Sequence, residues 1–444
     1  MTERIFKRKI YGQIQKWKTE NNGKTALLIE GARRVGKSTV VEEFARKEYE
    51  SYILIYFNIA SKAIKGLFDD LMDLDYLFLT LQTVYHKILV RRKSVIIFDE
   101  VQTCPKARQA IKYLVADGRY DYIETGSLVS IKKHTQEITI PSEEDRLTMY
   151  PMDYEEFRMA LGDENTITLL RTYWESKHSL GVAHRTAMRN LRLYMLVGGM
   201  PQAVNTYLDT NNFGEVDKIK RRIIRLYADD LLKIDSTGRA TKIFMSIPSQ
   251  LNHNRSRYVP SNVVGSIEES KMTELLKNIE DSKIINIVCH TDDPNVGMGF
   301  TKVDNCYKLF VSDTGLFVTM AFWDKNYTEN VLYEKLLSDK LSANMGYVYE
   351  NLIAQMLVST GNELFYYTWA KDDKHNYEID FVLSRGNKVC PIEVKSSGYK
   401  THASLDAFGK KFSSRVQQKY LIYTKDFAKD GDTLLVPVYM TMFL

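Results

Sequence analysis

A glycine-flanked loop carries the residues whose types and spacing point most directly to chemistry. Residues 31–39 read Gly-Ala-Arg-Arg-Val-Gly-Lys-Ser-Thr and fit the pattern G-x-x-x-x-G-K-[ST]. Gly31 and Gly36 allow backbone conformations in which successive N–H groups point at phosphate oxygens. Lys37 would supply a positive charge to the β- and γ-phosphates, and the Ser38 hydroxyl would bind Mg²⁺. The pattern therefore predicts a nucleotide-phosphate site with these candidate contacts: Gly31, Ala32, Arg33, Arg34, Val35, Gly36, Lys37, Ser38 and Thr39.

Two carboxylates follow an apolar run further along the chain. Residues 94–98 read Ser-Val-Ile-Ile-Phe and are followed by Asp99 and Glu100. A buried parallel strand would deliver both carboxylates at its carboxyl end. Asp99 would then hold Mg²⁺ through its water shell, and Glu100 would orient or deprotonate an attacking water. Acids are also common at helix starts, so the pair is informative because the loop precedes it.

Three more residues are candidates for contact with the γ-phosphate. The strand-like residues 120–124 lead to Thr125 and Ser127, either of which could sense that phosphate, with a plain turn as the alternative. Arg146 is a candidate arginine finger, acting in cis or across a subunit boundary, with a surface salt bridge as the alternative.

A second group of acids and a lysine lies near the C-terminal end of the sequence. Residues 378–383 and 389–397 surround a turn at Gly386-Asn387, a pattern typical of a β-hairpin. Strand alternation places Glu393 and Lys395 on one face. Asp380 lies on the first strand, and Glu350 lies on a helix-like stretch upstream. An exposed strand face carrying a Glu/Lys pair would explain the pattern without chemistry.

The elements around the loop predict the fold that positions it. Residues 25–30 and 52–58 are strand-like, and apolar residues recur at helical spacing after the loop and across residues 66–92. Strands that alternate with helices predict an α/β fold with a parallel sheet covered on both faces.

The motifs resemble those of AAA-type ATPases of bacteria and archaea that carry a C-terminal domain of unknown function. The resemblance rests on residues 31–39, 97–102 and 125–127, and further on residues 145–152, 196–201 and 308–316. The family usually has glycine where this chain has Asp145. The resemblance implies a P-loop NTPase core in which the loop and the Asp-Glu pair are the Walker A and Walker B elements. It also implies ATP and Mg²⁺ as cofactors and ATP hydrolysis as the activity.

The C-terminal acids resemble the core of PD-(D/E)xK nucleases. In that scheme Asp380 and Glu393 ligate Mg²⁺, Glu350 assists, and Lys395 orients the hydrolytic water or stabilises charge on phosphate. Such cores also persist as inactive binding modules, so a cleaving domain and an inert domain are both open. Tyr366, Tyr367 and Trp369 lie upstream, where they would stack on bases or pack in the core.

The sequence predicts four parts. Residues 1–155 form the ATPase core and begin with a short basic helix, in which Lys7, Arg8 and Lys9 would form a solvated face. Residues 156–237 form a helical lid, where the basic residues between 218 and 225 form the solvated face of an amphipathic helix. Residues 238–312 suggest a winged helix-turn-helix, whose acidic third helix favours protein contact over DNA reading. Residues 313–444 form the nuclease-like domain.

Composition leaves two main functional hypotheses. A net charge of +5 permits a nucleic-acid partner without requiring one. Scattered cysteines, the lack of a membrane-length apolar run and the lack of a signal sequence lead us to expect a cytoplasmic protein with no membrane partner. The first hypothesis is an ATPase whose nucleotide state is coupled to a nuclease-like module on DNA. The alternative is an ATP-driven switch that regulates a protein partner, with an inert C-terminal domain. A third and weaker hypothesis is that the protein is a regulator that binds DNA through the winged helix. A homo-oligomer follows if Arg146 acts in trans.

Overall fold

The computed structural model describes residues 4–126, 141–252, 257–324, 330–338, 346–396 and 400–444. The chain divides into two compact units, Met1–Tyr150 and Pro151–Leu444. Ser127, one of the two candidate γ-phosphate sensors, lies outside the described residues.

The first unit is built on a parallel sheet of five strands in the order β2-β3-β4-β1-β5. All of its neighbouring strands pair in parallel. Because β4 lies between β1 and β3, the carboxyl ends of these three strands meet at one edge. The strands are β1 (Ala26–Glu30), β2 (Ser51–Tyr56), β3 (Ser94–Asp99), β4 (Asp121–Gly126) and β5 (Glu144–Thr148).

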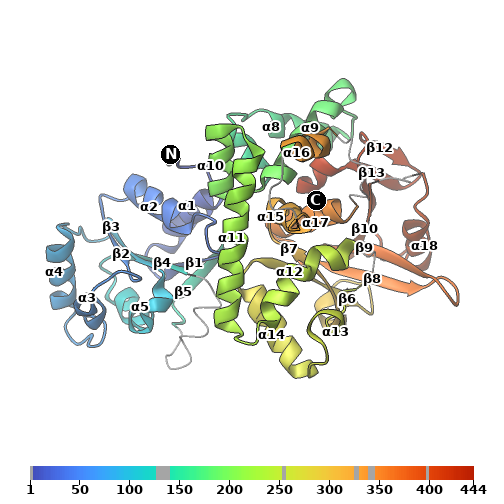
Figure 1. Cartoon of the computed structure of the whole chain (residues 1–444). Coiled ribbons are helices and arrows are strands. Elements are labelled where there is room, and N and C mark those ends of the chain that lie inside the picture. Colours follow the sequence, from blue (N-terminus) through green and yellow to red (C-terminus); the bar gives the residue numbers. More distant parts are fainter. Residues whose placement is uncertain (1–3, 127–140, 253–256, 325–329, 339–345, 397–399) are drawn as a thin grey trace. The chain divides into compact units, whose positions relative to one another are not determined.

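Helices lie on both sides of this sheet, with α2 and α5 on opposite sides (Figure 1). Every residue of β1 and β3 is buried, as expected for strands covered on both faces. The predicted α/β class of the ATPase core is confirmed. The helices of the unit are α1 (Ile10–Asn21), α2 (Lys37–Glu48), α3 (Lys62–Gly66), α4 (Leu74–Tyr85), the 3₁₀ helix η1 (Val101–Thr103) and α5 (Pro105–Asp117).

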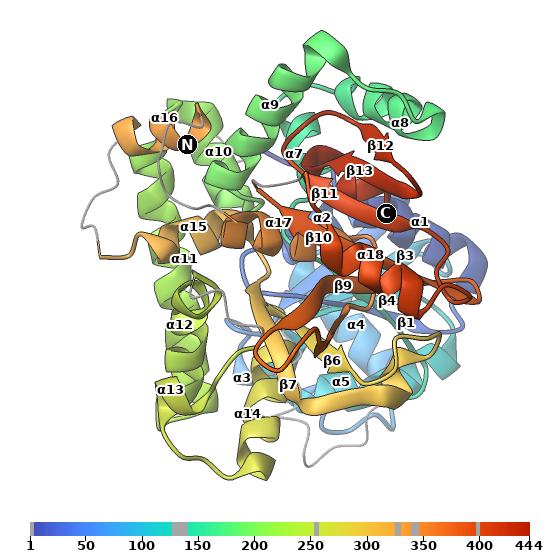
Figure 2. The ribbon, with the colours of Figure 1, turned by 90° about the vertical axis from the view of Figure 1, so that its right-hand side faces the viewer.

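The second unit contains a mixed sheet of eight strands in the order β12-β13-β11-β10-β9-β8-β6-β7. Strands β9 and β10 form the predicted antiparallel hairpin, with Ile392 opposite Phe381. Figure 2 shows this hairpin beside β11, with α18 nearby. The strands are β6 (Ile285–Thr291), β7 (Lys302–Val311), β8 (Phe365–Ala370), β9 (Asn376–Arg385), β10 (Lys388–Lys395), β11 (Lys419–Tyr423), β12 (Ala428–Asp430) and β13 (Thr433–Pro437).

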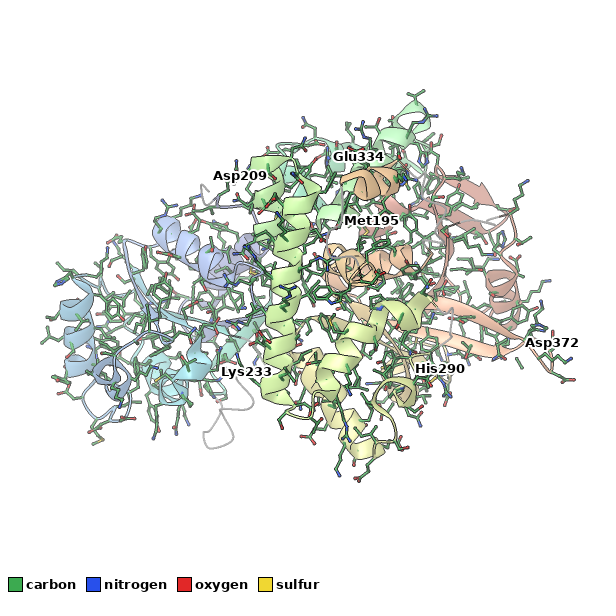
Figure 3. The ribbon with its side chains drawn as sticks, viewed as in Figure 1. Met195, Asp209, Lys233, His290, Glu334 and Asp372 are labelled. Atoms are coloured by element: carbon green, nitrogen blue, oxygen red, sulfur yellow. The ribbon has the colours of Figure 1, made fainter. Side chains whose placement is uncertain are left out.

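The longest helix described in the second unit is α11, which in Figure 3 runs from near the labelled Asp209 to Lys233. The other helices are α7 (Tyr154–Ala160), α8 (Thr166–Ser176), η2 (Gly181–Ala183), α9 (His184–Val197), α10 (Pro201–Thr210), α11 (Phe213–Ile234), α12 (Arg239–Asn252), α13 (Ser261–Val264), α14 (Glu269–Asp281), η3 (Met298–Thr301), α15 (Thr314–Ala321), α16 (Asn330–Leu337), α17 (Gly346–Ser359), α18 (Ala403–Lys411) and η4 (Val438–Phe443).

The basic residues of α11 do not all lie on a solvated face. Lys218, Arg222 and Arg225 are exposed as predicted. Lys220, however, is fully buried, and its ammonium donates to the carbonyls of Leu196 at 2.6 Å and Gly315 at 3.2 Å. The prediction was wrong for Lys220 because a lysine can serve as a buried donor to helix-end carbonyls, which sequence spacing alone does not reveal.

The elements expected of a winged helix-turn-helix are present in the expected order as α12, α13, α14, β6 and β7. The β6–β7 hairpin also continues the eight-stranded sheet, because β6 pairs in parallel with β8. The winged-helix assignment and the four-part division remain predictions. Among the described helices, none combines the length and apolar character needed to cross a membrane.

Candidate functional site

The loop between β1 and α2 has backbone geometry that its glycines make possible. Gly36 directly precedes α2 and has a φ of 98°, in the left-handed region. A Cβ placed on Gly31 would lie 2.3 Å from the carbonyl oxygen of Met149, so only glycine fits there. The sequence therefore folds the loop around two positions that exclude side chains, with the N-terminus of α2 directly after it.

Lys37 lies buried within the loop, with 5% of its surface exposed. Its ammonium donates to the carbonyl oxygens of Gly31 and Ala32, each at 3.0 Å. Burial lowers the pKa of Lys37, while Glu100 and Asp99 oppose that shift. The ammonium is thus held on the loop backbone beside two carboxylates, where a nucleotide's phosphates would add further negative charge.

Three oxygen-bearing side chains meet where the ends of β1, β3 and β4 converge. The hydroxyl of Ser38 lies 2.5 Å from Asp99 Oδ1, and the hydroxyl of Thr125 lies 2.7 Å from the same oxygen. Hydroxyl and carboxylate oxygens are the ligands that Mg²⁺ prefers. The residues therefore fit the metal that a bound nucleotide would bring, and Ser38 and Asp99 are the side chains that would hold it.

Glu100 occupies a strained backbone position directly after β3. Its φ is 54° and its ψ is 49°, a left-handed conformation that residues with a side chain rarely adopt. Its N–H donates to the Thr125 hydroxyl at 3.2 Å, and the amide of Gln102 donates to its carboxylate. The chain turns away from the strand at this residue and holds the carboxylate in place. Strained residues of this kind cluster at functional sites.

Arg146 lies on β5 and is 45% exposed. Its Nε donates to Glu144 Oε1 at 2.9 Å, and the buried Arg108 contacts the other oxygen of Glu144 at 2.9 Å. Glu124 lies in the same buried group, where burial and the nearby charge of Glu144 raise its pKa. Arg146 thus takes part in an ion pair, and its role as an arginine finger remains a prediction.

Arg8 contacts the loop, which the sequence analysis missed. Its Nη1 donates to the carbonyl of Val35 and its Nη2 to the carbonyl of Tyr150, both at 2.6 Å. It precedes α1, which begins at Ile10, so the predicted solvated helix face was wrong for this residue. Arginine is suited to this role because its planar fork can donate to two carbonyls at once.

The hairpin of the second unit positions the C-terminal candidates. Asp380 on β9 accepts a hydrogen bond from the backbone N–H of Val394 at 2.8 Å. Lys395 Nζ lies 3.1 Å from Glu393 Oε1 on the same strand, as the strand alternation predicted. The Glu350 carboxyl interacts electrostatically with Asp380. The four predicted residues therefore lie in one region.

A lysine that the sequence analysis named only as part of the family resemblance lies among these acids. Lys308 on β7 is 4% exposed, and its ammonium lies 2.5 Å from Glu378 Oε1 and 3.5 Å from Asp380 Oδ1. We call Glu350, Glu378, Asp380 and Glu393 the carboxylate cluster.

The described residues contain no group of three or more His, Cys, Asp or Glu side chains arranged to hold a metal ion. The carboxylate cluster as folded therefore does not fit the predicted Mg²⁺, and the Lys308 ammonium contacts two of its carboxylates, Glu378 and Asp380.

The charges of the carboxylate cluster are strongly perturbed. Burial raises the pKa of Glu350 to about 7, with Lys308 opposing the shift and Asp380 adding to it. Burial also raises the pKa values of Asp380 and Glu393. For Lys308, the nearby acids, led by Glu378, outweigh burial and raise its pKa.

The aromatic residues upstream of the hairpin mostly pack in the core. Tyr366 and Tyr367 are 1% and 6% exposed, so neither presents a face to a base. Trp369 is half-buried and packs against Tyr367, with ring centroids 5.2 Å apart. Core packing, the alternative in the sequence analysis, explains both tyrosines.

Comparisons with known families match three parts of the chain. Residues 23–158 match a family described as an AAA domain. Residues 345–441 match a domain of unknown function named DUF4143, and residues 188–327 match another named DUF8612. No curated protein matches the chain.

Solved structures with some similarity include three archaeal proteins. A Walker-type ATPase of Pyrococcus abyssi is 18% identical with a TM-score of 0.41, covering 72% of this chain and 97% of its own. A signal transduction ATPase with a tetratricopeptide repeat sensor from Pyrococcus horikoshii is 14% identical with a TM-score of 0.27, covering 80% of this chain and 48% of its own. Cdc6p from Pyrobaculum aerophilum is 12% identical with a TM-score of 0.28, and the match covers 77% of this chain and 97% of Cdc6p.

The family match and the geometry agree on the first unit. The matched segment contains the glycine loop, Lys37, the Asp99–Glu100 pair and the parallel sheet that brings them together. Residues 23–158 thus match an AAA domain, and the first unit has the parallel sheet and glycine loop of a P-loop fold.

Proposed function

We propose that the chain is an ATP-hydrolysing switch whose nucleotide state controls a protein partner, with a C-terminal unit that does not cleave nucleic acid. The observation that carries the ATPase part is the convergence of Ser38, Thr125 and Asp99 within 2.7 Å beside the loop. A carboxylate that already contacts two hydroxyls is placed to order a metal and its water shell when the nucleotide arrives.

Each residue of the first site has a defined task in this proposal. Ser38 and Asp99 would hold the Mg²⁺ that accompanies the nucleotide, and that ion would supply positive charge against the charge that develops on the phosphates. Lys37 would move from the loop carbonyls to those phosphates. Glu100 would orient the attacking water, held by Gln102 and by the backbone turn that its own φ creates. Thr125 would report the γ-phosphate through its contacts with Asp99 and Glu100.

Phosphate release from ATP tests the ATPase proposal. Lys37→Ala should reduce turnover by about 100-fold or more, since it removes a preorganised charge at the transferring phosphoryl group. Lys47→Ala is the matched control, because Lys47 lies on the same helix but is exposed and pairs with Glu43 at 2.7 Å. Turnover that is unchanged in Lys37→Ala would show that hydrolysis occurs elsewhere or not at all.

The first hypothesis of the sequence analysis, an ATPase coupled to a DNA-cleaving module, remains the second candidate. The hairpin that brings Asp380, Glu393 and Lys395 together favours it, whereas Lys308 among the acids favours the inert module. Labelled single- and double-stranded DNA, incubated with Mg²⁺ or Mn²⁺ with and without ATP, separates the two candidates. Cutting that is lost in Glu393→Ala would establish the nuclease.

A further inference from the structure

A buried lysine replaces the expected metal in the carboxylate cluster of the second unit. We infer that Lys308 is the resident cation of this cluster and that it excludes a divalent metal ion from the place where the carboxylates converge. The inference deepens the proposal that the C-terminal unit does not cleave nucleic acid. The inference does not depend on ATP hydrolysis by the first unit, so an experiment can contradict the inference without contradicting the ATPase proposal, and the reverse.

Lys308 reaches the cluster from a strand that is not adjacent to it. In the strand order, β8 and β6 lie between β9 and β7. The ammonium lies 5.4 Å from the ring centre of Tyr366 on β8 and ends at Glu378 and Asp380 on β9. The ammonium of Lys308 therefore lies against acids of another strand and is buried rather than exposed to solvent.

The surrounding structure fixes this placement from two sides. On β7, Lys308 is paired in register with Val288 of β6. On α17, Asn351 is adjacent to Glu350, and its side chain both accepts from the N–H of Val311 at 2.8 Å and donates to its carbonyl at 3.0 Å. Strand β7 and the helix that carries Glu350 are thereby tied together, which fixes the backbone from which the Lys308 side chain extends.

Two lysines partly compensate the charge of the carboxylate cluster without a metal. Lys308 contacts Glu378 and Asp380, and Lys395 contacts Glu393 and the carbonyl of Thr401. A divalent cation bound to Asp380 would have to approach an ammonium 3.5 Å from that carboxylate, and like charges at this separation in a buried site repel strongly. Glu393 Oε2 is buried and has no hydrogen-bond partner among the described residues, so this oxygen would serve as one ligand of a metal that enters the cluster of Lys308→Met.

Manganese binding to the nucleotide-free protein tests the inference. Mn²⁺ is titrated into the wild type and into Lys308→Met, which keeps an unbranched apolar stem and removes the charge. We expect no saturable site in the cluster of the wild type and one saturable site in Lys308→Met, so that the variant binds one more Mn²⁺ than the wild type. The new site should disappear in the double variant Lys308→Met/Asp380→Asn.

Two control variants identify where the metal binds. Lys302→Met makes the same substitution on the same strand at an exposed lysine that lies 3.7 Å from Asp304, and it should gain no site. Asp99→Asn, measured in parallel, identifies any binding at the phosphate loop. Wild-type Mn²⁺ binding that is lost in Asp380→Asn alone would overturn the inference.

If Lys308→Met does not fold, comparing Mn²⁺ binding by the wild type and by Asp380→Asn still tests the inference. Wild-type Mn²⁺ binding that Asp380→Asn leaves unchanged would support the inference, because a metal held by the carboxylate cluster needs the Asp380 ligand.

Discussion

At the residue scale, Glu100 is the proposed residue that orients the attacking water, but its backbone conformation lowers the free energy of unfolding. Its φ of 54° costs about 1 kcal/mol for a residue with a Cβ, and glycine removes that cost. We expect Glu100→Gly to raise the free energy of unfolding by about 1 kcal/mol relative to Glu100→Gln, which keeps the Cβ. Both variants should retain ATP binding and lose most hydrolysis. Chemical denaturation and phosphate release measure the two effects.

The comparison with Glu100→Gln isolates the backbone contribution, because both variants lose the carboxylate that accepts from Gln102. Equal unfolding free energies for the two variants would contradict the assignment of strain to this residue. Retained hydrolysis in Glu100→Gln would instead remove Glu100 from the catalytic role.

Much of the first site could be predicted because its parts are local in sequence. The loop, Lys37 and Ser38 are contiguous, and Asp99 ends an apolar strand whose type is visible from composition. Arg8 was missed because its partner Tyr150 lies 142 positions away, and a basic residue before a helix resembles a solvated one. Lys308 was missed for the same reason. Its strand reads as an ordinary half-buried strand, and only the fold of the sheet brings it to the acids.

At the element scale, Lys220 links α11 to the end of α9 and the start of α15. Its ammonium donates to the carbonyls of Leu196 and Gly315, and burial lowers its pKa from 10.5 to about 8. Between these pH values the unfolded chain binds more protons at this lysine than the folded chain does. The contribution of Lys220 to unfolding free energy therefore rises with pH across this window, by about 3 kcal/mol for a shift of this size.

Replacing Lys220 with methionine should remove this pH dependence. The unfolding free energy of the wild type should increase by about 3 kcal/mol relative to Lys220→Met as the pH rises from about 8 to about 10.5. Denaturant unfolding across this pH range measures the difference. Lys218→Met, at an exposed lysine two positions away, should follow the wild type. A constant gap between wild type and Lys220→Met would show that the lysine titrates normally.

Helices and strands could be predicted where their residues follow a simple periodicity. They were harder to predict where a strand forms by pairing with another strand that is distant in the sequence. The strands of residues 52–58 and 94–99 and the C-terminal hairpin follow alternation or apolar runs, and the structure contains them. Strand β5 was considered only as a motif, because Glu144, Asp145 and Arg146 are charged. It forms because β1 offers a parallel edge and because the Thr25 hydroxyl lies 2.5 Å from Asp145. The extension of the β6–β7 hairpin into an eight-stranded sheet depends on β6–β8 pairing, which no local pattern encodes.

At the scale of the whole molecule, each unit has its own sheet and its own core, so each can give its own unfolding transition. ATP with Mg²⁺ at 100 times its Kd should stabilise the unit that binds it by about 2.7 kcal/mol. Calorimetry of the full chain should therefore show the transition of the first unit moving to higher temperature. Lys37→Ala should abolish this shift, while Lys47→Ala should preserve it.

The second transition in the same experiment reports on the proposed switch. If nucleotide state controls the C-terminal unit, a ligand bound by the first unit must change the stability of the second, because coupling between sites is reciprocal. Lys220→Met identifies that transition, since the substitution lies within residues 151–444. We expect ATP to move both transitions in the wild type and neither in Lys37→Ala. A second transition that is insensitive to ATP would mean that the two units are thermodynamically independent and that the control of a protein partner does not pass through the C-terminal unit, even if ATP is hydrolysed.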